Sequence, residues 1–478
     1  MNYATASSAP IRPDTHTMLQ VVQAFDRVPF AEVPVDGAEA MEGKLQAALG
    51  VFGERDSWLA PHARAAVLRR AATLLEGRRD HFARQIAREG GKPLTDAIIE
   101  VTRAIDGLHC AAEELRTFAG REVPMGLTPA SSRRWAFTTR EPIGVVFAIS
   151  AFNHPLNLIV HQVAPAIAVG CPVIVKPASA TPLSCRDFVA LLHEAGLPEA
   201  WCQTFMPRSS ALAEQLACDP RISFLSFIGS AAVGWRLHGK LAPGTRSALE
   251  HGGVAPAIVD RSADLDRIIE PLVKGGFYHA GQVCVSTQRI YVHEDIVGEF
   301  TERLVARVAK LRTGDPTLPE TEVGPLINPK EVDRITDWIG AAVAAGATRA
   351  IGGERLSATT MQPTVLLEPP ADARVSREEV FGPVVCIYRY SRLDEAIARA
   401  NSLRAPFQAC VFSDDIDVAL RASERLEASA VMINDPTTFR TDWMPFAGRR
   451  EAGYGVGGIP YTMRDMTQEK MVVLHRRA

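Results

Sequence analysis

Several features that mark other protein classes are missing from this sequence of 478 residues. Its eight cysteines include no CxxC pair, which argues against a disulfide framework or a zinc site and favours reduced thiols. The 52 basic and 55 acidic side chains form no long run of one sign, so neither a nucleic acid nor a membrane is expected as a partner. No basic segment followed by an apolar one opens the chain, so no signal peptide is predicted. We therefore expect a cytoplasmic protein without a metal site.

One uncharged stretch is long enough to resemble a membrane helix. Residues 143–175 contain no Asp, Glu, Lys or Arg. Asn153, Pro155 and Gly170 interrupt the run and divide it into an apolar strand, a helix and a second apolar strand. The stretch therefore predicts a buried strand–helix–strand unit of a parallel sheet.

Strand and helix patterns continue to alternate on both sides of this unit. The alternation up to about residue 252 predicts a doubly wound α/β fold with helices on both faces of the sheet. Residues 37–118 are helical in pattern, and a second alternation from 254 to about 445 predicts a second α/β domain. Two or three domains are expected for a chain of this length.

Two β-like segments, residues 131–144 and 469–477, fit neither alternation. They could be edge strands of the main sheets. Alternatively, they could pair with each other and with another subunit, because exposed strand edges are natural docking surfaces.

A dinucleotide site is indicated although the GxGxxG motif is absent. Gly229, Ser230 and Gly234 lie at a strand-to-helix junction, where free N–H groups could hold a pyrophosphate. Lys176 ends a buried strand, and ligands of α/β sheets bind at the carboxyl ends of strands. A structural turn and a solvent-facing lysine are the alternative interpretations.

Cys284, in "GQVCVS", is the candidate nucleophile, because a thiolate in that setting can meet a substrate. We interpret the other seven cysteines as small buried hydrophobes: Cys110, Cys171, Cys185, Cys202, Cys218, Cys386 and Cys410.

Two further residues could assist the thiol. Asn153 could donate its amide N–H to an oxyanion beside the Cys284 main-chain N–H, or it could cap a helix before Pro155. Glu250 ends an apolar strand, where desolvation would raise its pKa towards that of a general base. A salt-bridged carboxylate at a domain junction is the alternative for Glu250.

The motifs together resemble the aldehyde dehydrogenase superfamily from about Gly37 to the C-terminus. The matching segments follow the family order, and they are "FNHP", "VIVKPAS", "FIGSAAVG", "LEHGG", "GQVC", "EEVFGPV", "IND" and "MPFAGRREAGYG". The resemblance implies oxidation of an aldehyde to a carboxylic acid with NAD or NADP. Cys284 would form a thiohemiacetal and then a thioester, Asn153 would hold the oxyanion, and Glu250 would activate the hydrolytic water.

The same resemblance implies cofactor contacts and an architecture. Lys176 would bind the adenosine ribose, Ser230 the pyrophosphate and Glu379 the nicotinamide ribose, with Phe381 packed beside it. The fold would be a Rossmann-like cofactor domain (residues 1–121 and 142–250), an α/β catalytic domain (251–445) and a β oligomerisation flap (122–141 and 459–478). A homodimer or a dimer of dimers is therefore expected.

Departures from the family pattern bear on specificity. Ser179 stands where many NAD-preferring members carry a glutamate, so use of NADP becomes plausible. His251 and Val254 alter the usual "ELGGK" motif. His154 resembles members that act on small aldehydes with a phosphonate or hydroxyl group. Val283 stands where phosphonate users tend to have arginine, so the sequence by itself does not favour an anionic substrate.

Other substrate candidates are Phe152, Phe446 and two arginines, Arg103 and Arg440, which could instead be solvated surface residues. Two other functions stay open. A coenzyme A-acylating dehydrogenase would pass the thioester to a thiol, although Glu250 disfavours this. The second open function is that of a catalytically silent dinucleotide-binding protein.

Overall fold

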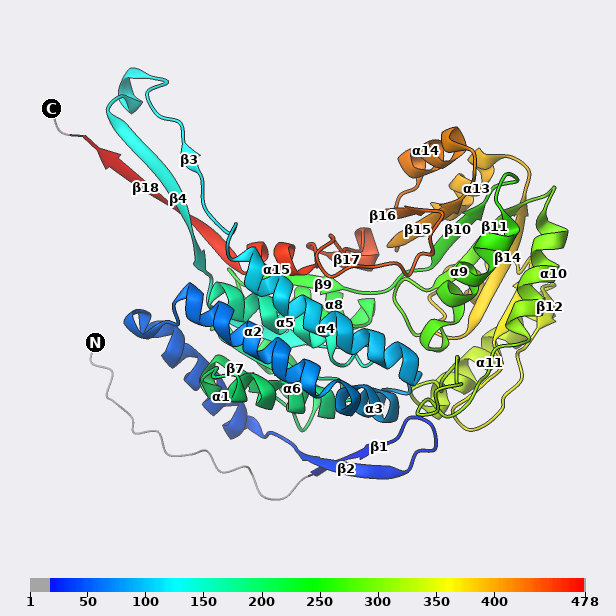
Figure 1. Cartoon of the computed structure of the whole chain (residues 1–478), viewed down its shortest axis with the longest axis horizontal. Coiled ribbons are helices and arrows are strands. Elements are labelled where there is room, and N and C mark those ends of the chain that lie inside the picture. Colours follow the sequence, from blue (N-terminus) through cyan, green and yellow to red (C-terminus); the bar gives the residue numbers. More distant parts are fainter. Residues whose placement is uncertain (1–17, 477–478) are drawn as a thin grey trace.

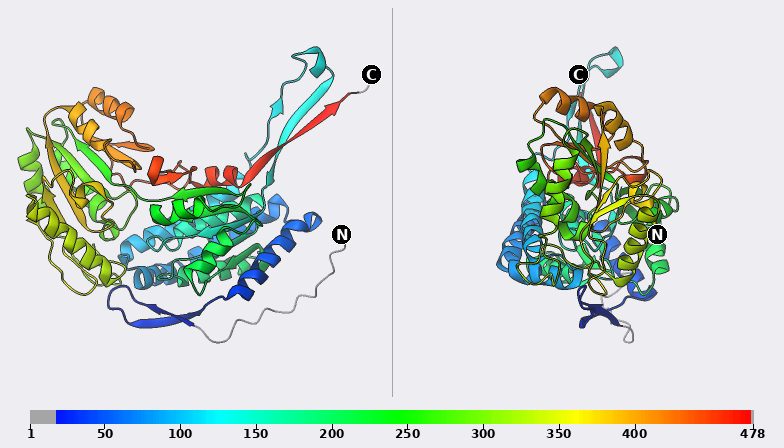
Figure 2. Two further views of the ribbon diagram at one scale, coloured as in Figure 1. Left: turned by 180° about the vertical axis from the view of Figure 1, so that it is seen from behind. Right: turned by 90° about the vertical axis from the view of Figure 1, so that its right-hand side faces the viewer.

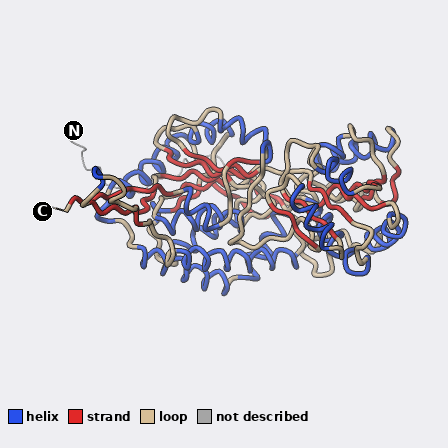
Figure 3. The backbone as a smooth tube through the Cα atoms, turned by 90° about the horizontal axis from the view of Figure 1, so that it is seen from above, coloured by secondary structure: helices blue, strands red, loops and turns tan. Residues whose placement is uncertain are grey.

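Two parallel sheets form the cores of two lobes in this computed structural model, which describes residues 18–476 (Figure 1). Figure 3 shows strands running through the middle of both lobes, with helices outside them. This arrangement confirms the α/β prediction.

The sheet of the first lobe has five parallel strands and one short antiparallel edge strand. In spatial order the strands are β17 (Gly453–Tyr454), β9 (Arg246–Glu250), β8 (Ile222–Ile228), β5 (Val145–Ile149), β6 (Val173–Lys176) and β7 (Cys202–Thr204). All five side chains of β5 are buried, as expected for a central strand covered on both faces.

Alternate residues of β5 enter two different apolar cores, one on each face of the sheet. Val146 and Ala148 pack with a large set of helices: α2 (Pro61–Gly77), α3 (Arg79–Gly90), α4 (Leu94–Glu114), α5 (Asn157–Val169) and α6 (Leu183–Glu194). Val145, Phe147 and Ile149 pack with α1 (Ala38–Gly53), α7 (Ser210–Ala217) and α8 (Ala231–His238). The first sheet is therefore doubly wound, and the uncharged stretch 143–175 lies at its centre.

The second lobe is built on a sheet of six parallel strands and one antiparallel edge strand. Its strands are, in spatial order, β12 (Thr348–Ile351), β13 (Thr364–Leu367), β14 (Val384–Tyr390), β11 (Thr287–His293), β10 (Ala255–Val259), β15 (Gln408–Phe412) and β16 (Ala430–Ile433). The helices of this lobe are α9 (Leu265–Phe277), α10 (Val297–Val308), α11 (Pro329–Ala344), α12 (Arg374–Arg377), α13 (Leu393–Ala400) and α14 (Ile416–Arg425).

A three-stranded arm projects from the first lobe (Figures 1 and 2). It consists of β3 (Glu122–Val123), β4 (Arg134–Pro142) and β18 (Thr467–His475). The ladder between β4 and β18 runs without a break from Thr467 opposite Pro142 to His475 opposite Arg134. The predicted pairing of these two segments is therefore confirmed, and their placement as edge strands of the main sheets is wrong. Contact of the arm with another subunit stays a prediction.

Two elements were not anticipated from the sequence. A hairpin of β1 (Met18–Val22) and β2 (Pro29–Pro34) precedes the first helix. Helix α15 (Ile459–Asp465) buries Ile459 and Met463 in the core of the first lobe. Within the segment 459–478 of the predicted flap, β18 is the element that extends into the arm. The domain limits given above otherwise stay predictions. No helix within residues 18–476 is long and apolar enough to cross a membrane.

Candidate active site

A pocket of about 500 Å³ takes its walls from both lobes. It gathers most of the residues singled out from the sequence, although they are spread over more than three hundred positions. The predicted site residues that line it are Cys284, Glu250, Asn153, Lys176, Gly229, Ser230, Glu379, Phe381, His154, Phe152, Val283, Arg103, Arg440 and Phe446. Ser179 and Gly234 do not line it: Ser179 lies in an exposed turn after β6, and Gly234 lies behind His251.

Cys284 is presented by a sharply turned loop between α9 and β11. His279, Ala280 and Gly281 all have positive φ angles, of 49°, 55° and 71°. The two valines beside the cysteine are buried in an apolar cluster with Phe407 and Phe446, which anchors the loop while the thiol stays half-buried. A left-handed conformation is costly for His279 and Ala280 but not for Gly281, so the first two residues store backbone strain next to the candidate nucleophile.

Burial raises the pKa of the Cys284 thiol to about 12, against an opposing effect of the positive charge of Arg440. The resting group is therefore a thiol that needs a base or a bound partner before it can attack. Of the other seven cysteines, five are buried as expected, but Cys110 and Cys218 are only half-buried, so the expectation of full burial is wrong for these two.

Asn153 is buried, and its Nδ2 donates a hydrogen bond to the carbonyl oxygen of Gln282, 2.9 Å away. This contact joins the strand-to-helix turn of the first lobe to the loop that carries Cys284. The helix that follows is α5, whose N-cap is Leu156. The alternative that Asn153 caps this helix is therefore wrong.

Glu250 ends β9, and burial raises the pKa of its carboxyl above the ordinary value of 4.5, while the charge of Arg440 opposes the shift. No ion pair holds this carboxylate anywhere in the described part of the chain, so the salt-bridge alternative is not supported. A Cβ atom at Gly457 would lie 2.0 Å from its Oε1 atom. Glycine at position 457 thus makes room for the carboxylate in its present orientation.

The predicted cofactor residues, among them Ser230 and Glu379, line a surface that we call the cofactor cradle. Some polar groups of this surface have no hydrogen-bond partner within residues 18–476. Ser230 is the N-cap of α8, which leaves the first N–H groups of that helix free for an anion. Glu379 Oε1 is buried without a hydrogen-bond partner, and a Cβ atom at Gly252 would lie 1.8 Å from it. An orphaned carboxylate oxygen fits a ribose hydroxyl, and a helix N-terminus fits a pyrophosphate. The residues present therefore fit a dinucleotide.

Aromatic and histidine side chains complete the cradle. Phe381, with a φ of 47°, meets Phe152 edge to face with ring centroids 5.9 Å apart. His251 Nδ1 lies 3.0 Å from the carbonyl oxygen of Gly229 and holds the turn before α8. A Cβ atom at Gly234 would lie 2.0 Å from His251 Cε1, so the glycine allows the imidazole to pack there.

Two arginines give part of the pocket wall a positive charge. Arg103 forms a two-pronged ion pair with Asp442, at 2.7 and 3.2 Å. The guanidinium of Arg440 stacks on Phe446, 3.5 Å from the ring centre, and has no ion pair within residues 18–476. Because both side chains line the pocket, their interpretation as solvated surface arginines is wrong.

Several residues in or behind this part of the pocket wall were not identified from the sequence. Tyr278 lines the pocket with its hydroxyl 3.3 Å from His154 Nε2. Asp442 and His161 lie behind the wall and contact its polar groups. The "FYHAGQ" segment could have suggested Tyr278, but nothing local marks Asp442 or His161.

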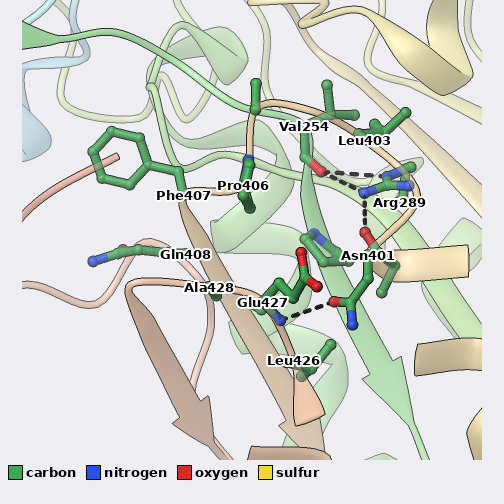
Figure 4. Close-up of a pocket in the computed structure, with 14 residues that line it drawn as sticks. Val254, Arg289, Asn401, Leu403, Pro406, Phe407, Gln408, Leu426, Glu427 and Ala428 are labelled. Carbon is green, nitrogen blue, oxygen red and sulfur yellow. Dashed lines mark hydrogen bonds between the residues drawn. The ribbon is translucent and has the colours of Figure 1, made fainter. Parts of the chain in front are cut away.

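A small cavity in the second lobe contrasts with this pocket (Figure 4). Arg289 donates there to the carbonyl oxygens of Val254 and Ala400, and Asn401 Oδ1 accepts from the N–H of Glu427. The protein itself thus satisfies the polar groups of Arg289 and Asn401, whereas both amide atoms of Gln408, which also lines the cavity, are buried without a hydrogen-bond partner within residues 18–476. The cavity of about 10 Å³ has room for no more than about one water molecule, so we assign no ligand to it.

Comparison with known proteins agrees with this geometry. Residues 11–472 match the model of the aldehyde dehydrogenase family. A 3-sulfolactaldehyde dehydrogenase of Priestia aryabhattai is 35% identical over 461 residues, which cover 96% of each chain.

Two solved structures superpose over nearly the whole chain. One is aldehyde dehydrogenase 21 from Physcomitrella patens in complex with its product succinate, with a TM-score of 0.94, 36% identity and coverage of 98% of this chain and 96% of that one. The other is the glyceraldehyde-3-phosphate dehydrogenase GapN from Methanocaldococcus jannaschii complexed with NADP, with a TM-score of 0.92, 31% identity and coverage of 97% and 100%. The chain therefore belongs to the aldehyde dehydrogenase family and is an NAD(P)-dependent aldehyde dehydrogenase.

Proposed function

We propose that the enzyme oxidises a small aldehyde that carries an anionic group, and that Cys284, Asn153 and Glu250 perform the chemistry. One observation carries the substrate class: the Arg440 guanidinium lines the same pocket as Cys284 and has no carboxylate partner among the described residues. An unneutralised, partly desolvated guanidinium is a binding partner for a carboxylate, sulfonate or phosphonate. The names of the relatives support this class, since 3-sulfolactaldehyde and succinate are both anionic.

The chain's own groups would act in sequence. Glu250, whose pKa is raised, accepts the thiol proton, and the Cys284 sulfur attacks the carbonyl carbon to form a thiohemiacetal. The remaining amide hydrogen of Asn153 and the Cys284 main-chain N–H stabilise the developing oxyanion. The bound nicotinamide supplies the hydride acceptor. Glu250 releases the thiol proton to solvent and then takes a proton from the water that attacks the Cys284 thioester. The bond from the acyl carbon to the Cys284 sulfur breaks as the carboxylic acid forms. A base at this position favours the hydrolytic route over transfer to coenzyme A.

The cofactor would lie over the cradle described above. Lys176 would bind the adenosine ribose, the N-terminus of α8 with Ser230 the pyrophosphate, and Glu379 the nicotinamide ribose. Position 179 carries no carboxylate to repel a 2′-phosphate, which supports use of NADP.

The arm supports a homodimer or a dimer of dimers. Its exposed apolar side chains include Leu127, Trp135, Met471 and Leu474, with exposed fractions of 81%, 43%, 56% and 46%. Trp135 and Leu474 lie opposite each other on one face of the ribbon, Met471 lies on the other face, and Leu127 lies in the connection between β3 and β4. Exposed apolar side chains on a paired ribbon are typical of an assembly surface. A cytoplasmic location is consistent with the unpaired thiols of the eight cysteines.

A pair of aldehydes of equal length tests the substrate class. Turnover is followed by absorbance of the reduced nicotinamide, with 4-oxobutanoate as the anionic aldehyde and butanal as its neutral counterpart. We expect kcat/KM to be about a hundredfold higher for the anionic aldehyde. Equal values for the two would refute the proposed class while leaving aldehyde oxidation intact.

A further inference from the structure

Two buried side chains behind the pocket connect three of its polar wall residues. Asp442 and His161 are 2% and 4% exposed, and neither lines the pocket. Asp442 accepts hydrogen bonds from Arg103 and, at 3.1 Å, from Asn157 Nδ2. His161 lies between Asp442 and Arg440. Arg103, Asn157 and Arg440 all line the pocket, so these two hidden groups touch its anion-facing wall from behind.

The contacts fix the tautomer of His161. Its Nε2 lies 2.7 Å from Asp442 Oδ1, and its Nδ1 lies 3.3 Å from an Nη atom of Arg440. A carboxylate only accepts and a guanidinium only donates, so Nε2 carries the hydrogen and Nδ1 offers a lone pair. Burial lowers the pKa of His161 to about 4, which keeps the ring neutral at ordinary pH.

The orientation of Arg440 depends on this ring. Its guanidinium carbon lies over the Phe446 ring, 3.5 Å from the ring centre, a contact that places the group but does not set the directions of its N–H bonds. His161 Nδ1 is its hydrogen-bond partner within residues 18–476, and its Nε is buried without one. A long, mobile side chain loses much entropy when it is fixed, so an acceptor that fixes it beforehand favours ligand binding.

We propose that His161 and Asp442 are positioning residues. His161 holds the guanidinium group of Arg440 and Asp442 holds that of Arg103, so that both arginines are oriented to bind the anionic end of the substrate. The inference rests on the proposed function, because it presumes an anionic substrate. The carboxylate neutralises Arg103, whereas the neutral imidazole orients Arg440 without cancelling its charge. Helices α4 and α5 and the loop after β16 are joined at Asp442, which makes the arrangement rigid.

Two substitutions at position 161 separate the two contacts of the ring. In His161→Gln the amide nitrogen occupies the place of Nε2 and can still donate to Asp442, but the acceptor for Arg440 is lost. In His161→Asn the amide oxygen occupies the place of Nδ1 and can still accept from Arg440. The pair is therefore matched in polarity and differs in which contact survives.

Kinetics with 4-oxobutanoate and butanal give the readout. We expect His161→Gln to raise KM for 4-oxobutanoate about tenfold with little change in kcat, and to leave butanal unaffected. His161→Asn should restore most of the loss, and Arg440→Met should show the loss even more strongly. Turnover of butanal reports folding, and His161→Phe, which keeps an aromatic ring but removes both hydrogen bonds, replaces His161→Gln if that variant does not fold.

The outcomes distinguish the two proposals. Equal KM values for 4-oxobutanoate in the wild type and His161→Gln, with butanal turnover intact, would overturn the positioning role. An equal loss for both aldehydes, or no rescue by His161→Asn, would also overturn it, since it would show general structural damage. A wild-type enzyme with no preference for 4-oxobutanoate would instead refute the proposed substrate class.

Discussion

Asn153 of the first lobe donates its side-chain amide to the carbonyl oxygen of Gln282 in the second lobe, at 2.9 Å. Gln282 lies two residues before Cys284, so the contact sets the candidate oxyanion donor beside the candidate nucleophile. The amide has two hydrogens, and one remains for the substrate oxygen.

Replacing Asn153 by alanine should therefore impair the chemical step. We expect kcat to fall by about a hundredfold to a thousandfold, with a small change in KM, because the lost donor acts mainly in the transition state. Stopped-flow measurement of reduced-nicotinamide formation checks this. Asn401→Ala is the control, since it removes a side chain that bonds Arg425 and Glu427 away from the pocket. Normal kcat in Asn153→Ala would remove the residue from the mechanism.

The fit of Gly457 against Glu250 gives a second prediction. A methyl group at 457 would lie 2.0 Å from Glu250 Oε1 and 2.8 Å from the carbonyl oxygen of Phe446. Gly457→Ala should displace the carboxylate and slow steady-state turnover about tenfold or more. Gly340→Ala is the matched control, because it lies in α11 with nothing within 4 Å, where alanine should stabilise the protein by about 0.5–1 kcal/mol. Unchanged turnover in Gly457→Ala would show that turnover does not depend on the present position of the Glu250 carboxylate.

Cofactor choice is testable at position 179. Ser179→Glu introduces a carboxylate in the turn after Lys176, and we expect KM for NADP to rise about tenfold while KM for NAD changes much less. Ala180→Glu adds the same charge to the neighbouring residue of the turn and controls for a general effect of charge. If both substitutions affect NAD and NADP equally, residue 179 does not determine the preference.

The buried carboxyl of Glu379 predicts a pH dependence of stability. Burial raises its pKa in the folded enzyme to about 8, from an ordinary value of 4.5. Between these two values the folded state holds a proton that the unfolded chain has lost, so this group makes the free enzyme less stable as pH rises. Glu379→Gln has no proton to lose there.

The melting temperature of Glu379→Gln, relative to the wild type, should therefore increase from pH 5 to pH 8. Glu378→Gln is the control, because the hydrogen bond from Arg374 lowers the pKa of that exposed carboxyl. The ion pair of the Glu378 carboxylate with Arg374 stabilises the folded enzyme at pH values above the unfolded pKa of Glu378. This stabilisation is lost only as pH falls through the lower pKa of the folded state. A constant difference between Glu379→Gln and the wild type would mean that Glu379 is ionised throughout the range.

The sequence predicts some parts of this enzyme well because their signals are local. The uncharged run around β5 and the alternating patterns that follow it are each visible within a few tens of residues. The motifs around Cys284, Asn153 and Glu250 indicate the same chemistry separately, and the fold brings them to one pocket.

Other parts could not be predicted because their partners are distant in the chain. In the sequence, Asp442 has the features of an ordinary loop carboxylate. Only the fold shows its contact with His161 of α5, which is 281 positions earlier in the chain. Arg103 and Arg440 look like surface residues until the lobes meet. Helix α15 joins the first core only because the chain returns there after completing the second lobe.

The central claim is that Cys284 forms a thioester that Glu250 helps to hydrolyse. The most direct measurement is a rapid-mixing experiment on Glu250→Gln with NADP and 4-oxobutanoate, followed by mass spectrometry of the quenched protein. The account predicts that about one equivalent of reduced cofactor forms, more slowly than in the wild type because the thiol has lost its base, that further turnover is slower still, and that the acyl mass lies on the peptide that contains Cys284. Product release with no acyl-enzyme detected, or an acyl group on any other residue, would contradict it.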